Sequence, residues 1–194
     1  MMRSKVPFDI TRPVAPWVVF GPRGAAEFTE QAAAFSATGG RVYEVDARDL
    51  VDGAAVCDAL ARAVGYPGSF GWNWDALVDR LDDLGDALTG GVGIVVVVRG
   101  ADALLGADHL RVFMTMLCLG ADRANNEVDP DGNLRDEPVV IEHFVFLLDE
   151  VRAEDFAAGI EHPDLDVGAE GDFLTVTLDL DVWRPDPAGR PKAS

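Results

Sequence analysis

The feature that most constrains the fold is an uninterrupted apolar run at residues 94–98, inside a β-branched segment, 92–98, that is bounded by glycines. A strand that is apolar on both faces suits the centre of a parallel sheet covered by helices on both sides. The run is far too short to cross a bilayer, which takes about 20 apolar residues. The segment therefore predicts an α/β core built around one central strand.

Strand and helix patterns alternate along the rest of the chain. We expect strands at 17–20, 41–46, 92–98 and 143–148, and helices at 25–35, 53–64, 73–84 and 104–124. Such alternation predicts a small, mostly parallel sheet with crossover helices. The last predicted strand, 172–183, differs because apolar residues alternate with Thr and Asp. This pattern is typical of an antiparallel or edge strand.

The length and composition fit one globular domain. The chain has 194 residues, of which 48% are hydrophobic and 26% charged, enough to bury a core without disulfides or metals. Within that domain we expect three regions. They are an N-terminal arm with an extra strand-helix unit at 1–40, a core at 41–150, and a C-terminal edge strand with a disordered Pro-rich tail at 151–194.

The charge balance restricts the class of partner. Sixteen basic residues stand against 34 acidic ones, so the formal net charge is −18. Nucleic acids and anionic membranes need Lys and Arg to displace counterions, and neither is expected to bind. The surplus of carboxylates indicates either a strongly solvated surface or a basic protein partner.

The two cysteines and the N-terminal residues indicate the cellular compartment. Cys57 and Cys118 lie far apart, each inside a predicted helix, with no Cys or His nearby at metal-ligand spacing. Buried free thiols suit the reducing cytosol. The N-terminal residues lack the charged-then-apolar pattern of a signal peptide. We expect a cytoplasmic protein without a metal or a cofactor.

Motifs for catalysis are weak. Residues 20–24 lie between a predicted strand and helix and faintly resemble a dinucleotide-binding turn, but the middle glycine is missing and Pro22 removes an amide donor. Residues 129–133 place their glycine too early for a calcium-binding EF-hand loop. The three histidines, His109, His143 and His162, are scattered. We do not expect an enzyme.

The most informative stretch is the predicted helix 73–84 with the loop before it. Asn73 is a favourable N-cap. At 100° per residue, one face carries the apolar side chains of Trp74, Leu77, Leu81 and Leu84. The far side carries the carboxylates of Asp75, Asp79 and Asp82, bordered by Asp83. Like charges at this spacing weaken a helix by about 0.2–0.5 kcal/mol per pair. The acidic face is therefore either a solvated surface or a site for a cationic partner.

The loop adds two aromatic residues, Phe70 and Trp72, next to the acidic face. Aromatic groups beside a rigid row of carboxylates make a favourable protein-binding surface. Trp72 has a second interpretation, as a half-buried staple over the start of the helix.

Residues 70–77, Phe-Gly-Trp-Asn-Trp-Asp-Ala-Leu, followed by Asp79, Leu81 and Leu84, resemble the signature of the barstar-like family. Members of this family inhibit a ribonuclease inside the cell. The resemblance covers roughly residues 41–150 and implies a barstar-like fold. It also implies an immunity protein that covers the active site of a basic ribonuclease or ribonuclease-type toxin.

The resemblance assigns roles to single residues. Asp75 and Asp79 match the family aspartates that enter the basic cleft, while Ser69 and Val78 fall where the type member has a contact tyrosine and a contact tryptophan. The predicted partner-binding residues are Ser69, Phe70, Gly71, Trp72, Asn73, Asp75, Val78, Asp79, Asp82 and Asp83. Asp122 and Glu127 are candidates for a further acidic contact.

Aromatic anchors usually dominate the energy of an interface, so their loss at 69 and 78 leaves an alternative open. In that alternative, the chain is a barstar-fold interaction module whose partner is a non-ribonuclease toxin or a regulatory protein. The sequence does not decide the oligomeric state.

Overall fold

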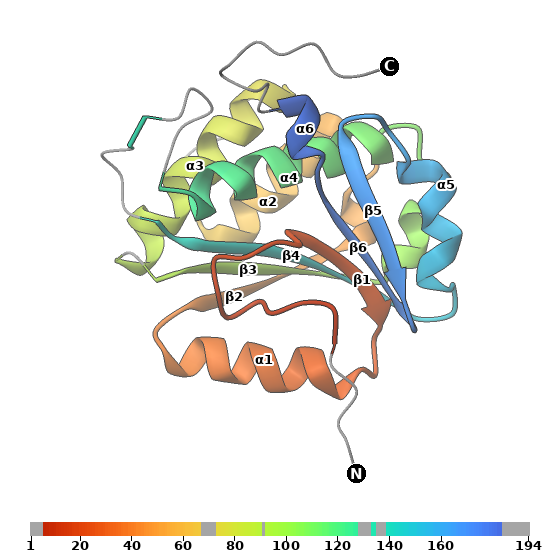
Figure 1. Cartoon of the computed structure of the whole chain (residues 1–194), viewed down its shortest axis with the longest axis horizontal. Helices are drawn as coiled ribbons and strands as arrows, with labels where there is room; N and C mark the ends of the chain where they lie inside the picture. The colour runs from red at the N-terminus through yellow and green to blue at the C-terminus, as the bar shows by residue number, and fades with distance from the viewer. Residues whose placement is uncertain (1–5, 67–72, 91, 128–132, 135–138, 184–194) are drawn as a thin grey trace.

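A computed structural model describes residues 6–66, 73–90, 92–127, 133–134 and 139–183, with the side chains of 82–89 excepted. Within this part, a six-stranded sheet has the strand order β2-β3-β4-β1-β6-β5. Helices α2, α3 and α4 cover one face of the sheet and α1 covers the other (Figure 1). The tail from residue 184 onward, predicted to be disordered, lies outside the described residues.

The elements have the following bounds. The strands are β1 Val18–Pro22, β2 Arg41–Asp46, β3 Gly93–Arg99, β4 Ile141–Leu148, β5 Leu165–Glu170 and β6 Phe173–Leu178. The helices are α1 Ala26–Ala37, α2 Gly53–Val64, α3 Trp74–Thr89, α4 Leu110–Asn125, α5 Ala157–Ile160 and α6 Leu180–Trp183. Short 3-10 helices lie at Ala47–Asp49, Ala101–Leu104 and Ala153–Phe156.

The apolar run forms an interior strand, as predicted. Strand β3 pairs in parallel with β2 on one side and with β4 on the other. Ile94 and Val96 point into the larger core under α2, α3 and α4, whereas Val95 points into the smaller core under α1. Helices on both faces therefore account for a strand that is apolar at consecutive positions.

The N-terminal unit is part of the same sheet. Strand β1 pairs in parallel with β4 and antiparallel with β6, so it lies in the interior of the sheet. Its residues Val18, Val19 and Phe20 are fully buried. Phe28 and Phe35 of α1 close the smaller core on the opposite face. The expected extra strand-helix unit therefore extends the sheet and links it to the C-terminal hairpin.

The C-terminal prediction needs two corrections. Strand β6 is antiparallel as expected, but it ends at Leu178, and residues 180–183 form a helical turn. At the start of this turn the Asp179 carboxylate accepts the Asp181 N–H at 2.9 Å, a bond that favours a turn over a continued strand. Strand β6 is also not the edge of the sheet, because β5 pairs along its outer side.

The long helix predicted at 104–124 is likewise divided. A 3-10 helix ends at Leu104 and α4 begins at Leu110. Between them Gly106 has a φ of +79°, a conformation that favours glycine and interrupts a helix.

His143 attaches the N-terminal arm to β4. Its side chain is fully buried; Nδ1 lies 3.1 Å from the Pro16 carbonyl oxygen and Nε2 lies 2.8 Å from that of Arg12. Burial lowers the pKa of His143, and the contacts with the two carbonyl groups, which favour the charged ring, offset this only in part. Folding therefore favours the neutral imidazole relative to the unfolded chain.

We expect His143 to make stability depend on pH. Because its pKa is lower in the folded chain than the ordinary value of 6.5, the unfolded chain binds the proton first. The contribution of the buried, neutral His143 side chain to the free energy of unfolding is therefore complete above about pH 6.5. It is lost as the pH falls below that value. Urea denaturation between pH 8 and pH 5 should show that the free energy of unfolding falls more steeply with decreasing pH for the wild type than for His143→Gln. Parallel curves would show that this histidine is not the source.

Candidate partner-binding site

Helix α3 begins where the sequence predicted. The Asn73 side-chain oxygen accepts the Ala76 N–H at 2.8 Å, and its carbonyl oxygen accepts the Leu77 N–H at 3.2 Å. These bonds satisfy two of the donors that a helix start leaves open. The cap fixes the first turn, and with it the position of Asp75.

The inner face of α3 is firmly packed. Leu77 and Leu81 are 0% and 1% exposed, and the Trp74 ring centroid lies 6.1 Å from that of Phe113 on α4. A Cβ placed on Gly120 of α4 would come within 3.0 Å of the Leu81 Cβ. The two helices can approach this closely because Gly120 has no side chain, so α3 cannot rotate without losing these contacts.

The outer face presents its carboxylates to solvent. Asp75 is exposed, and the Asp79 side chain is 74% exposed. Asp79 Oδ1 lies 3.4 Å from Nη1 of Arg123, which comes from α4 and whose side chain is 34% exposed. An exposed pair of this kind contributes about 0–1 kcal/mol. Asp79 is therefore only loosely held and remains accessible to a partner.

One predicted contact residue, Val78, is buried in the structure. Val78 is 3% exposed and does not belong to the outer surface. At 100° per residue it lies only 40° from Trp74, so helical geometry places it beside the apolar stripe. Ser69, Phe70, Gly71 and Trp72 lie outside the described residues, as do the side chains of Asp82 and Asp83.

Replacing the cap gives a direct test of the helix start. Asn73→Ala should lower the free energy of unfolding by about 1 kcal/mol, because a side-chain acceptor is lost at the N-cap. Asn73→Asp retains an equivalent acceptor and should keep most of the stability. Urea denaturation of both variants gives the comparison. Equal losses in the two would mean that the side chain does not act as a cap.

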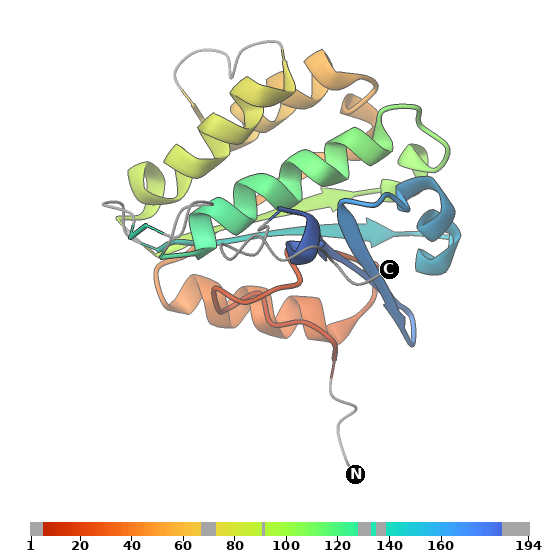
Figure 2. The same cartoon turned by 45° about the horizontal axis from the view of Figure 1, so that its top comes forward.

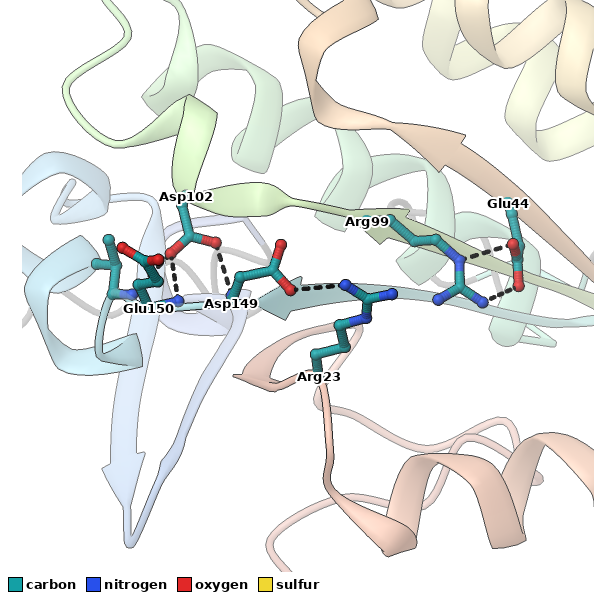
Figure 3. A network of polar contacts seen from close by, with 7 residues as sticks. Arg23, Glu44, Arg99, Asp102, Asp149 and Glu150 are labelled. Atoms are coloured by element: carbon teal, nitrogen blue, oxygen red, sulfur yellow. Dashed lines mark hydrogen bonds and ion pairs between the residues drawn. The ribbon is translucent and has the colours of Figure 1, made fainter.

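A cleft of about 640 Å³ lies at the carboxyl ends of the parallel strands. Figure 3 shows the polar contacts between side chains at this edge. Arg23, which follows β1, pairs with Asp149 after β4 at 3.2 Å. Arg99 of β3 pairs through two nitrogens with Glu44 of β2. Ligands of open α/β sheets often bind at this edge, so the cleft bears on the dinucleotide interpretation.

The charges around this cleft disfavour that interpretation. Its described lining holds three arginines and four carboxylates, from Arg23, Arg48, Arg99, Asp46, Asp102, Asp149 and Glu150. Each of the three arginines is paired with a carboxylate. An anionic ligand would have to displace these carboxylates before it could bind the arginines.

Asp102 has a structural role at the same edge. It accepts the N–H groups of Asp149, Glu150 and Val151 at 2.6–2.9 Å. Burial raises the pKa of the Asp102 carboxyl, but these hydrogen bonds lower it more, so its pKa lies below the usual value. The carboxylate therefore organises the loop that follows β4.

The described residues also bear on metal sites, membrane spans and free thiols. No group of three or more His, Cys, Asp or Glu side chains there is placed to hold a metal ion. No helix in that part combines the length and the apolar character needed to cross a membrane. Cys57 and Cys118 are both buried and free, as expected.

Comparison with known proteins identifies a family. Residues 40–135, about half of the chain, match the family model described as Barstar (barnase inhibitor). No curated protein and no solved structure matches the chain. The matched span runs from β2 through α2, α3 and β3 to α4, and so includes Asn73, Asp75 and Asp79. Through residues 40–135, this chain belongs to a barstar-like family.

Proposed function

We propose that this protein inhibits a ribonuclease by placing the carboxylates of α3 in the basic site that otherwise holds the RNA backbone. The observation that carries the proposal is the exposure of Asp75 and Asp79 on a helix whose opposite face is fixed by packing. A ribonuclease site must be cationic to hold phosphodiesters. A rigid row of carboxylates is complementary to it, and little ordering is needed on binding.

The whole chain supports the same partner. With a formal net charge of −18, it attracts a basic protein over a distance and repels RNA. Association should therefore be fast at low salt and slower at high salt, since ions screen the attraction beyond about 10 Å at 0.1 M. We place this activity in the cytoplasm, where an immunity protein would protect the cell's own RNA.

Arg123 competes with the partner for Asp79 in this mechanism. Its contact with Asp79 must be exchanged for a cation of the ribonuclease. The exchange costs about 0–1 kcal/mol, because the pair is exposed. The loose pair therefore does not block Asp79 from a partner.

The test uses barnase, the nuclease in the description of the matching family. Purified full-length protein is titrated into barnase while cleavage of a fluorescent RNA oligonucleotide is followed. Loss of cleavage that is complete near a 1:1 ratio is the expected result. Full barnase activity in the presence of a micromolar excess would contradict the proposal.

The second candidate is a barstar-fold module that binds a partner other than a ribonuclease. The burial of Val78 favours it, because the resemblance assigns a contact tryptophan to this position and the surface there provides no such anchor. The same titration separates the two candidates, since only an inhibitor stops RNA cleavage.

A further inference from the structure

A groove lies on the side of α4 that faces away from α3. It has a volume of about 610 Å³ and runs between the N-terminal arm, the last turn of α4, the β5–β6 hairpin and α6. Among its described lining residues, every charged side chain is acidic: Asp122, Asp166, Asp179 and Asp181. The described part of the groove lining is therefore acidic, with Asp166 on β5 and Asp179 after β6 among its carboxylates.

The same groove exposes apolar side chains. Val14 and Leu180 line it and are 38% and 46% exposed. Val182, two residues further along α6, is 45% exposed. Below them Trp17 and Leu178 are buried and form a firm floor. An apolar centre with a polar, charged rim is the usual composition of a protein–protein contact.

The groove adjoins the acidic face of α3. On the last turn of α4, Asp122 lines the groove while the next residue, Arg123, reaches Asp79 of α3. Figure 2 shows α4 between α3 and α6. One partner docked over the end of α4 can therefore touch both surfaces.

We infer that this groove is a second contact surface for the same basic partner, and that it receives a segment with an apolar side chain flanked by Lys or Arg. The inference rests on the proposed function. It is carried by charge complementarity, because the carboxylates of Asp166 and Asp179 line the same groove as the exposed apolar side chains of Val14 and Leu180. Most of the groove lining, from the N-terminal arm, the hairpin and α6, lies outside the matched residues 40–135, whereas Asp122 and Asn126 lie inside them.

The experiment compares matched variants of the full chain in calorimetric titrations with barnase. Asp166→Lys reverses a charge in the groove, and its control, Asp172→Lys, makes the same change at an exposed position outside the groove lining. Leu180→Ser removes an apolar group, and its control is Leu105→Ser, where the residue is 43% exposed. Each groove variant should weaken binding about 10-fold, and each control should bind as the wild type does, within about twofold.

The outcomes separate the two proposals. Groove variants that bind like their controls, while Asp79→Ala loses affinity, would overturn the groove and leave the inhibitor intact. No binding by the wild type would overturn both. Sedimentation analysis adds a third arm: a wild-type dimer that Leu180→Ser dissociates would show that a second copy occupies the groove, contrary to the inference.

Discussion

Replacing Asp79 with alanine should weaken binding to barnase by at least about 2 kcal/mol, which is roughly 30-fold in affinity. The partner's cations would remain buried without a counter-charge, and this usually costs more than the pair itself contributes. The fold should change little, because Asp79 is 74% exposed and makes one loose contact with Arg123. Calorimetric titration gives the affinity, and urea denaturation gives the stability.

The matched control is Asp172→Ala, which removes the same charge from an exposed site in the β5–β6 turn. Both variants change the net charge equally, by removing one negative charge, so any difference between them reports a local contact and not long-range attraction. If Asp79→Ala inhibited as well as the control, Asp79 would have no place in the binding site.

Replacing Leu81 with alanine should destabilise the fold by about 2–5 kcal/mol, the cost of a large cavity in a packed core. Leu81 is 1% exposed and packs against the backbone at Gly120, where α3 and α4 approach closely. Because α4 cannot move in to fill the space without disturbing Phe113 and its neighbours, the cavity should persist. Urea unfolding of the full chain measures the loss.

Leu105→Ala serves as the comparison, because this leucine is 43% exposed. It should cost less than about 0.5 kcal/mol. Equal losses for the two variants would mean that the interface between α3 and α4 is not a tightly packed part of the core.

Much of the fold follows from local patterns in the sequence. The bounds of β2 and α2 agree with the predicted segments 41–46 and 53–64, because clear apolar periodicity and good end signals coincide there. Strand β5 was missed because Asp166, Gly168 and Glu170 give its six residues little β-branched character. Its pairing with β6 stabilises it, and such tertiary support is not visible in a propensity.

The candidate site was predictable in part. The cap at Asn73 follows from residue type and position alone. Val78 is buried because helical geometry places it beside Leu81, and the family resemblance carries no information on how this side chain packs. The contact between Asp79 and Arg123 joins residues 44 apart in sequence, and the groove joins segments from both ends of the chain. Neither has a local sequence signal.

The most direct test of the central claim is competition with RNA. If the carboxylates of α3 occupy the phosphate sites of barnase, the apparent inhibition constant should rise linearly with RNA concentration, and saturating RNA should restore cleavage. Inhibition that does not change with RNA concentration would show that the protein binds elsewhere on the nuclease, and would contradict the account.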